Sequence, residues 1–454
     1  MRVVVIGGGI SGLATAFYVR RARPEAQVTV LEAAPRLGGT MLTREINGFR
    51  FEGGSNGFLS NKPYTLDLVR DSGAEPLLLP SNDAARIRFI YSGALHRLPE
   101  SPPAFLATPL LSWRAKLRVL SEVFTPARRD LADESLRDFG YRRVGKEFTD
   151  TFLDPMSAGI YASTAAKLSV HAAFPAVVRL EREYGGLFKG MVKRRKRRAG
   201  PGGRLMSFQG GVGTFIDHLG ETLGESVRTG VKVRGLRRAD AGYALVTTDG
   251  ELAADAVVLA TPAYAATRIL RHLDDDLAYW LGQVGYTPIA VVGFGYRELA
   301  HPLRGFGLLT TAASQQEILG VLWDSSIFPD RAPSGKKSLR VMIGGQRDSK
   351  LAMRSEEELI EIARRGLART MGITDTPAVT FVKRWRRGIP NYRLGHLANV
   401  ERIFARVASL WPGLYLNSNA YWGIGLNDCV GNAKRCAEAI ARGEPWRGGP
   451  LLEP

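Results

Sequence analysis

The sequence predicts a multi-domain α/β protein (α+β), in which a parallel-sheet domain is interrupted by a mixed sheet and by a helical insertion. Three observations carry this prediction. Residues 1–45 read as strand, glycine turn, helix and strand; residues 99–209 change to helical periodicity; and strand signals return between residues 230 and 344. With 454 residues, 45% of them apolar, the chain is long enough for two or three domains that each bury a core.

The N-terminal unit begins with Val3, Val4, Val5 and Ile6, a β-branched run that suits a parallel strand buried on both faces. A helix over 11–21 and a strand over 28–31 complete a βαβ unit. In the turn between strand and helix, Gly7, Gly9 and Gly12 form the pattern GxGxxG. The first glycine permits the tight turn, the second lets a pyrophosphate approach the backbone, and the third lets helix and strand pack closely.

Glu32 closes the second strand 20 residues after the last of these glycines, where a carboxylate can accept hydrogen bonds from ribose hydroxyls. The unit therefore predicts a Rossmann-like domain that holds an adenosine dinucleotide. NAD and FAD share this pattern, so these residues alone do not separate the two cofactors.

The middle of the chain is expected to be helical over 99–209, because apolar residues recur every three or four positions. Six basic residues lie within 193–198, a run typical of a solvated or disordered loop.

Strands are expected beyond this region, over 230–236, 243–248, 257–260, 289–296, 307–309, 319–323 and 339–344. A helix over 356–371, a strand over 413–417 and a helix over 428–442 follow. This order predicts three domains: a discontinuous nucleotide-binding domain (1–86, 210–265 and 385–454), a substrate-binding domain (87–98 and 266–384) and the helical domain (99–209).

Composition limits the partners. The net charge of +18 favours anions; there is no DNA-binding motif, so no nucleic acid is expected, and an acidic small molecule or anionic lipid fits better. We find no signal peptide and no spanning apolar segment, and expect a cytoplasmic protein. Two cysteines and six scattered histidines predict neither a disulfide framework nor a metal site.

A second feature separates FAD from NAD. Residues 32–39 read ExxxRxGG, with Arg36, Gly38 and Gly39 following the ribose-binding acid. This run resembles the extended motif of the flavin amine oxidases, phytoene desaturases and protoporphyrinogen oxidases, and it implies FAD as the cofactor. The C-terminal segment 417–429 is similar to theirs too, and it would direct the start of the last helix at the flavin.

The resemblance implies a set of cofactor-binding residues along the chain. They are Gly7, Gly8, Gly9, Ile10, Ser11, Gly12, Glu32, Ala33, Arg36, Gly38, Gly39, Gly54, Ser55, Asn56, Val233, Ala260, Thr261, Trp385, Gly423, Gly425 and Leu426.

Most of the chain resembles the oxygen-dependent protoporphyrinogen oxidase and coproporphyrinogen III oxidase family, in segments such as FEGGSNGFL (51–59), FLDPMSAGIYA (152–162), LWDSSIFPDRAP (322–333) and GIPNYRLGH (388–396). The resemblance implies six-electron oxidation of protoporphyrinogen IX to protoporphyrin IX in heme biosynthesis, with O₂ as acceptor and hydrogen peroxide released. Coproporphyrinogen III is the alternative substrate. An amine oxidase, a carotenoid desaturase and a non-enzymatic flavoprotein are more distant alternatives.

Substrate contacts follow from the same resemblance. Arg88 would face a propionate; Leu309, Leu322 and Met342 would sandwich the rings; and Gly159, expected on a loop beside the flavin, would orient the hydrogen through its carbonyl. No general base stands out. From the residues alone, the apolar side chains could equally be core, Arg88 a solvated face and Gly159 a turn.

The resemblance also makes the helical insertion a membrane-docking region, with an apolar surface of Pro102, Phe105, Leu106, Leu110, Leu111 and Trp113. The protein would then lie peripherally on the inner face of the cell membrane, at an anionic surface. Packing of these residues against the rest of the fold is the alternative, and a homodimer is left open.

Overall fold

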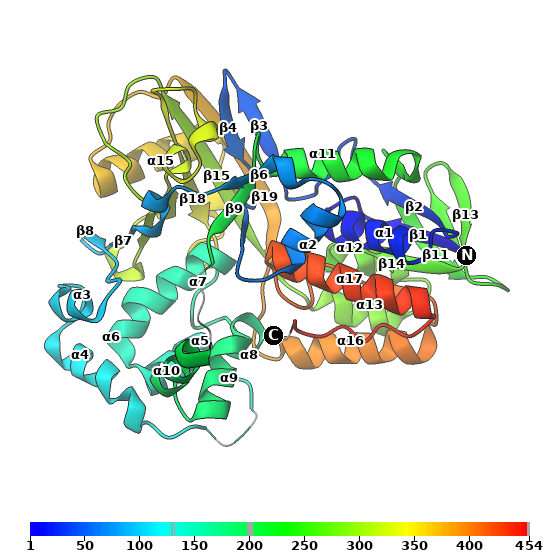
Figure 1. The fold of residues 1–454 in the computed structure, drawn as a ribbon, viewed down its shortest axis with the longest axis horizontal. Coiled ribbons are helices and arrows are strands. Elements are labelled where there is room, and N and C mark those ends of the chain that lie inside the picture. The colour runs from blue at the N-terminus through cyan, green and yellow to red at the C-terminus, as the bar shows by residue number, and fades with distance from the viewer. Residues whose placement is uncertain (129, 131, 198–202, 452–454) are drawn as a thin grey trace.

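The computed structural model describes residues 1–128, 130, 132–197 and 203–451. Three parts can be followed in Figure 1: a parallel sheet with its helices, a larger mixed sheet, and a helical region between residues 102 and 197. The α/β, multi-domain fold predicted from the sequence is confirmed.

The parallel sheet has five strands in the order β10-β2-β1-β14-β20. Helices cover both of its faces, so Val3 and Val5 in the central strand are fully buried. The strands are β1 (Arg2–Ile6), β2 (Gln27–Glu32), β10 (Val227–Thr229), β14 (Ala256–Leu259) and β20 (Leu414–Leu416). The helices are α1 (Ile10–Ala22), α2 (Tyr64–Asp71), α11 (Val212–Leu223), α12 (Ala263–Leu270), α13 (Asp275–Gly282), α16 (His396–Leu410) and α17 (Leu426–Arg442).

Small antiparallel sheets surround this domain. They comprise β3 (Thr43–Ile46) with β4 (Phe49–Glu52); β5 (Phe58–Leu59), β9 (Leu205–Phe208) and β6 (Leu78–Pro80); and β11 (Val233–Arg238), β12 (Tyr243–Thr247) and β13 (Gly250–Ala254). The strand expected over 230–236 begins later, as β11. The preceding strand β10, which the sequence did not reveal, pairs with β2 in the parallel sheet.

The mixed sheet has seven strands in the order β19-β15-β18-β17-β16-β7-β8. They are β7 (Arg88–Tyr91), β8 (Leu95–Arg97), β15 (Tyr286–Tyr296), β16 (Gly307–Thr310), β17 (Ile318–Leu322), β18 (Lys337–Gly344) and β19 (Val379–Pro390). Beside β17 and β18 lies the short helix α14 (Asp324–Ile327). The expected domain boundary at residue 385 falls inside β19, an edge strand that the sequence prediction missed.

One face of the mixed sheet is covered by α15 (Glu356–Met371). The helix begins with a capping box between Ser355 and Glu358 and ends at Gly372, whose φ of 67° suits a glycine. Buried residues of β15 and β18, among them Val292 and Val341, pack against it. Because side chains alternate along a strand, the neighbouring residues of these strands point to the opposite face.

The helical region contains α3 (Pro102–Ala107), α4 (Trp113–Leu120), α5 (Leu136–Arg143), α6 (Lys146–Phe148), α7 (Asp154–Tyr161), α8 (Val170–Ala173), α9 (Pro175–Tyr184) and α10 (Leu187–Arg197). Two expectations are corrected here. Strand β9 lies within the range expected to be helical, and the basic run 193–198, expected to be a loop, is helical as far as Arg197. Residue 198 and the side chains of 194–197 lie outside the described part of the chain.

Candidate functional site

The glycine turn between β1 and α1 is built as the sequence suggested. Gly7 has a φ of 114°, and a Cβ on Gly12 would lie 1.9 Å from the carbonyl oxygen of Gly7, so only glycine fits. A Cβ on Gly9 would meet nothing closer than 4.0 Å, which leaves the backbone open on that side. Gly9 is also the N-cap of α1 and supplies no capping side chain, so the helix start can receive a phosphate.

Opposite this turn lies the segment after β2. The backbone N–H of Gly38 donates to the carbonyl of Gly8 at 2.8 Å, and Gly9 and Gly38 form a parallel bridge. Glu32 accepts hydrogen bonds from the N–H groups of Gly8 at 2.7 Å and Ala34 at 2.8 Å. Its carboxylate therefore braces the loop, and its remaining lone pairs can still accept from hydroxyls.

Positive charge gathers beside the glycine turn and the loop after β2, which together form the glycine cradle. Arg36 donates to the carbonyls of Leu37 at 2.8 Å and Gly39 at 2.7 Å, so its guanidinium is fixed along the loop. Burial lowers the pKa of Lys383 on β19, and the charges of Arg36 and Arg44 lower it further. Three cations near one another suit a diphosphate. The sequence prediction missed Lys383 and Arg44.

The C-terminal segment brings a further charge pair to the start of α17. The helix is capped by Gly425, and Asp428 in its first turn accepts from the Gly425 N–H at 3.3 Å and from Lys62 Nζ at 2.9 Å. A Cβ on Gly423 would lie 2.6 Å from Asp428, so this glycine allows the loop to close on the helix. Lys62 was not predicted, because nothing in its local sequence marks it.

The remaining predicted cofactor residues come from several elements. Ala260 and Thr261 follow β14 and border Gly7, and Trp385 Nε1 donates to the Gly53 carbonyl at 2.6 Å. The others are distributed at the head of α1 (Ile10, Ser11), after β2 (Ala33), after β4 (Gly54, Ser55, Asn56), at the start of β11 (Val233) and at the start of α17 (Leu426). Thr261 Oγ1 and Asn56 Nδ2 are buried and have no hydrogen-bond partners among the residues that the structure describes. A glycine-lined cradle, clustered cations and these orphaned polar atoms fit FAD, a long cofactor with a diphosphate and many hydrogen-bonding groups.

The four predicted substrate residues lie on one face of the mixed sheet, opposite α15. Strand register places Arg88, Gly307, Leu322 and Arg340 in one row across β7, β16, β17 and β18. The next row on the same face contains Leu309, Gly320, Met342, Val291 and Lys383. Gly307 and Gly320 in these rows lie close to their neighbours, since a Cβ on Gly320 would lie 2.9 Å from Leu309 Cδ2, and the face is otherwise mostly apolar. Arg88 is exposed at the side of this face, with its guanidinium 5.2 Å from the centre of the Phe306 ring.

Gly159 lies in the helix α7 rather than on the expected loop. The helix packs against β16 and β17, and a Cβ on Gly159 would lie 2.8 Å from Leu309 Cδ2. Glycine is disfavoured inside helices, and the expected loop was implied by the family resemblance. Here it allows α7 to approach the face that carries Leu309, so Gly159 and the substrate residues are brought together.

A buried ionic network joins this face to the nucleotide-binding part. Arg340 donates to both carboxylate oxygens of Asp324, at 2.7 and 2.8 Å, and to Asn56 Oδ1 at 2.9 Å and the Glu52 carbonyl. Arg340 and Asp324 each expose 1% of their surface. Since Arg340 holds the Asn56 oxygen, the amide must direct its Nδ2 away from Arg340. An arginine within the apolar sequence SLRVMIGG was the only available signal for this network.

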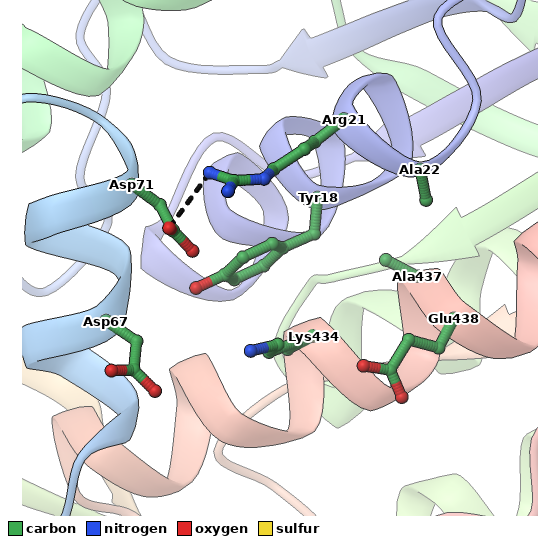
Figure 2. Close-up of a pocket in the computed structure, with 8 residues that line it drawn as sticks. All are labelled: Tyr18, Arg21, Ala22, Asp67, Asp71, Lys434, Ala437 and Glu438. Atoms are coloured by element: carbon green, nitrogen blue, oxygen red, sulfur yellow. Dashed lines mark ion pairs between the residues drawn. The ribbon is translucent and has the colours of Figure 1, made fainter.

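A hollow of about 560 Å³ lies elsewhere, between α1, α2 and α17, and Figure 2 shows its charged lining with the ion pair of Arg21 and Asp71. Tyr18 in this lining is nine residues along α1 from Gly9, about 13 Å at 1.5 Å per residue. This hollow is therefore separate from the glycine cradle and from the sheet face that carries Leu309.

A dinucleotide cradle on a parallel sheet, facing an apolar sheet surface under α7, defines a flavin-dependent oxidoreductase. Comparison with known proteins agrees. The sequence matches the family described as flavin containing amine oxidoreductase over residues 10–441, and the chain belongs to this family. The predicted enzyme class and FAD as cofactor are confirmed.

Individual relatives are similar over nearly the whole chain. The coproporphyrinogen III oxidase of Bacillus subtilis (strain 168) is 31% identical, over 95% of this chain and 96% of its own. The chloroplastic protoporphyrinogen oxidase of Oryza sativa subsp. japonica is 33% identical, over 96% and 88%. A crystal structure from Exiguobacterium sp. 255-15, assigned provisionally as a protoporphyrinogen oxidase, superposes with a TM-score of 0.86 at 30% identity and covers 97% of this chain and 98% of its own.

Proposed function

We propose that this enzyme oxidises protoporphyrinogen IX to protoporphyrin IX in heme biosynthesis, a six-electron reaction with O₂ as the final acceptor and hydrogen peroxide as the second product. The observation that carries the proposal is one face of the mixed sheet, where the half-buried Leu309, Leu322 and Met342 lie with the exposed Arg88 at one side. An apolar surface with a cation at its edge suits a macrocycle with propionates on one edge. The relatives named as porphyrinogen oxidases support the same substrate class.

The chain's own residues would act by position. Bound FAD supplies the electron acceptor, and the glycine cradle, Glu32 and the cations beside Arg36 would hold it. The side chains named on this sheet face are apolar or cationic, so we assign no general base; hydride removal depends on orientation more than on proton transfer. Arg88 would fix the rotation of the ring by binding a propionate, and Gly159 would offer its carbonyl from α7.

Coproporphyrinogen III, with four carboxylates, is the second candidate, because the Bacillus subtilis relative is named for it. Both porphyrinogens should be supplied to the purified holoenzyme in air, and porphyrin fluorescence and peroxide followed in parallel. We expect faster turnover of protoporphyrinogen IX. Exclusive turnover of the tetracarboxylate would overturn this choice, and failure of either porphyrinogen to bleach the flavin without oxygen would overturn the whole proposal.

An amine oxidase or desaturase is a weaker alternative. The aromatic residues Tyr421 and Trp422 could have suggested a pair facing the flavin. However, Tyr421 is 1% exposed and packs edge-to-face on Phe404, with ring centres 5.4 Å apart, and Phe404 also contacts Trp422. These aromatic rings therefore serve the core around α16 and α17, which does not favour amine oxidation.

We also propose that the helical region contacts an anionic membrane surface. Trp113, Leu117, Leu120 and Phe124 are exposed by 67%, 64%, 49% and 86%, and their spacing of four, three and four places them on one side of α4 and the turn after it. Two members of the surface expected from sequence differ in burial: Leu106 is exposed, whereas Leu111 is buried at 3%. Among the described residues, no helix is long and apolar enough to cross a membrane.

The high positive charge would draw this surface to acidic headgroups. Co-sedimentation with phosphatidylglycerol-containing vesicles tests the contact, with phosphatidylcholine vesicles as the comparison. We expect binding to the acidic vesicles and its loss in the double variant Trp113→Ser, Phe124→Ser. Equal sedimentation of wild type and variant would contradict the assignment.

A further inference from the structure

We propose that Arg347 and Asp154 form a clamp that holds α7, and Gly159 within it, at a set distance from the sheet face that carries Leu309. Both are positioning residues that act through α7 and β16. The inference rests on the proposed function, since α7 packs against Leu309, which lies on the sheet face where the macrocycle is placed.

The guanidinium of Arg347 joins α7 to β16 directly. Its Nη2 donates to Asp154 Oδ2 at 3.1 Å, while Nη1 donates to the carbonyl of Thr310 at 2.7 Å and to its Oγ1 at 3.1 Å. Asp154 is the first residue of α7, and Thr310 is the last residue of β16, next to Leu309. One side chain thus connects the start of the helix to the strand beneath it.

The other end of α7 is attached to the same loop. The backbone N–H of Gln346 donates to the carbonyl of Ala162, the C-cap of α7, at 2.7 Å. Asp154 Oδ1 also accepts from the Ala165 N–H at 2.9 Å, which folds the following turn back onto the helix start. Residues 346 and 347, just beyond β18, therefore hold both ends of the helix.

The backbone around α7 is unusual, which explains why a clamp is needed. A π-helical turn (Thr149–Leu153) leads into it, and Ala162 ends it with a φ of 48°, a left-handed conformation that is unfavourable for a residue with a Cβ. Such conformations persist only where surrounding contacts impose them, and they cluster at functional sites.

The ion pair is largely buried, with 14% of the Arg347 side chain and 15% of the Asp154 side chain exposed. Both Nη atoms of Arg347 donate to these partners, whereas its Nε is buried and has no hydrogen-bond partner among the described residues. The guanidinium therefore holds the start of α7 to β16 through its two terminal nitrogens. Loss of Arg347 would leave Asp154 without its cation and release the start of α7 from β16.

The test compares Arg347→Met with a matched control, Arg406→Met. Arg406 also pairs with a buried aspartate, Asp274, at 2.7 Å, but it links α16 to the start of α13, away from the sheet face. Hydrogen exchange of the 155–162 segment is measured in each FAD-loaded protein. The rate of flavin reduction by saturating protoporphyrinogen is measured without oxygen, and reoxidation of dithionite-reduced flavin by O₂ is followed separately.

We expect Arg347→Met to raise exchange in 155–162 at least tenfold and to slow flavin reduction at least tenfold, with reoxidation unchanged within twofold. Arg406→Met should change neither the exchange nor the reduction. If Arg347→Met does not fold, the double variant Arg347→Gln, Asp154→Asn, which leaves no unpaired buried charge, should show the same two changes at smaller size.

Unchanged exchange in 155–162 in the variant that folds, or equal slowing of flavin reduction by Arg406→Met, would overturn the clamp. Failure of the proposed function has a different signature. In that case porphyrinogen would not bleach wild-type flavin, while the exchange measurement would still decide whether the clamp holds α7.

Discussion

Substitution of Gly159 by alanine separates the stability of α7 from its close packing against Leu309 on the sheet face. The new Cβ would lie 2.8 Å from Leu309 Cδ2 and 3.3 Å from Cδ1, whereas carbon atoms in contact normally stay about 3.5–4.0 Å apart. Overpacking of this kind costs about 1–3 kcal/mol. If that cost falls on the substrate-bound geometry, kcat/KM for protoporphyrinogen drops about 5- to 160-fold.

Helix propensity works in the other direction, because alanine is about 1 kcal/mol more favourable than glycine inside a helix. Gly159→Ala should therefore reduce activity while the melting temperature and the flavin content stay close to wild type. Initial rates of porphyrin fluorescence in air, with flavin absorbance as a loading control, provide the assay.

A double-mutant cycle with Leu309→Ala makes the reasoning refutable. Truncation of Leu309 removes the atoms that the new methyl group would meet, so the double variant should lose less than the sum of the two single losses. Strictly additive losses, or full activity in Gly159→Ala, would show that the contact with Leu309 does not limit the reaction.

Four further variants probe other parts of the structure. Gly12→Ala should abolish flavin retention, measured as the flavin-to-protein absorbance ratio, because its Cβ would fall 1.9 Å from a backbone oxygen of the glycine turn. Arg340→Met should lower the free energy of unfolding in urea by about 3–5 kcal/mol, since it leaves the carboxylate of Asp324 buried and unpaired; a loss below about 1 kcal/mol would contradict this. Arg88→Ala should raise KM far more than it lowers kcat, because a remote ion pair supplies uniform binding, and a pure kcat defect would argue against the propionate role. Burial lowers the pKa of His396 from 6.5 to about 4. As the pH falls, the unfolded chain therefore takes up a proton before the folded protein does. Acidification from pH 6.5 to 4 should lower the free energy of unfolding by about 3 kcal/mol. Urea unfolding at several pH values should show a shallower acid loss in His396→Gln, and an unchanged slope would exclude His396 as the cause.

The nucleotide-binding part could be predicted from local sequence because its constraints are local. Gly7, Gly9 and Gly12 occupy a single turn, and the buried β-branched run before them has one plausible structure. Resemblance to a family located Arg88, Leu309, Leu322 and Met342, and strand register now places all four on one face.

The features that the sequence did not predict depend on contacts between residues far apart in the chain. The family resemblance implied a loop at Gly159, whereas the structure places it inside α7, in close contact with Leu309, 150 residues away. Strand β19 was missed because Lys383, Arg384, Arg386 and Arg387 interrupt its apolar alternation. Arg340 and Arg347 are ordinary arginines in the sequence, and only the fold shows the carboxylates that pair with them.

The order of strands in the parallel sheet bears on how the protein is made. β1 is synthesised about 250 residues before its neighbour β14, and β20 at the edge forms only when residue 416 has been synthesised. Until then the glycine turn has no completed sheet behind it and no α17 beside it. Chains that stop before residue 414 lack both elements, so we expect them to retain flavin poorly, because a cofactor stabilises only a fold that can bind it.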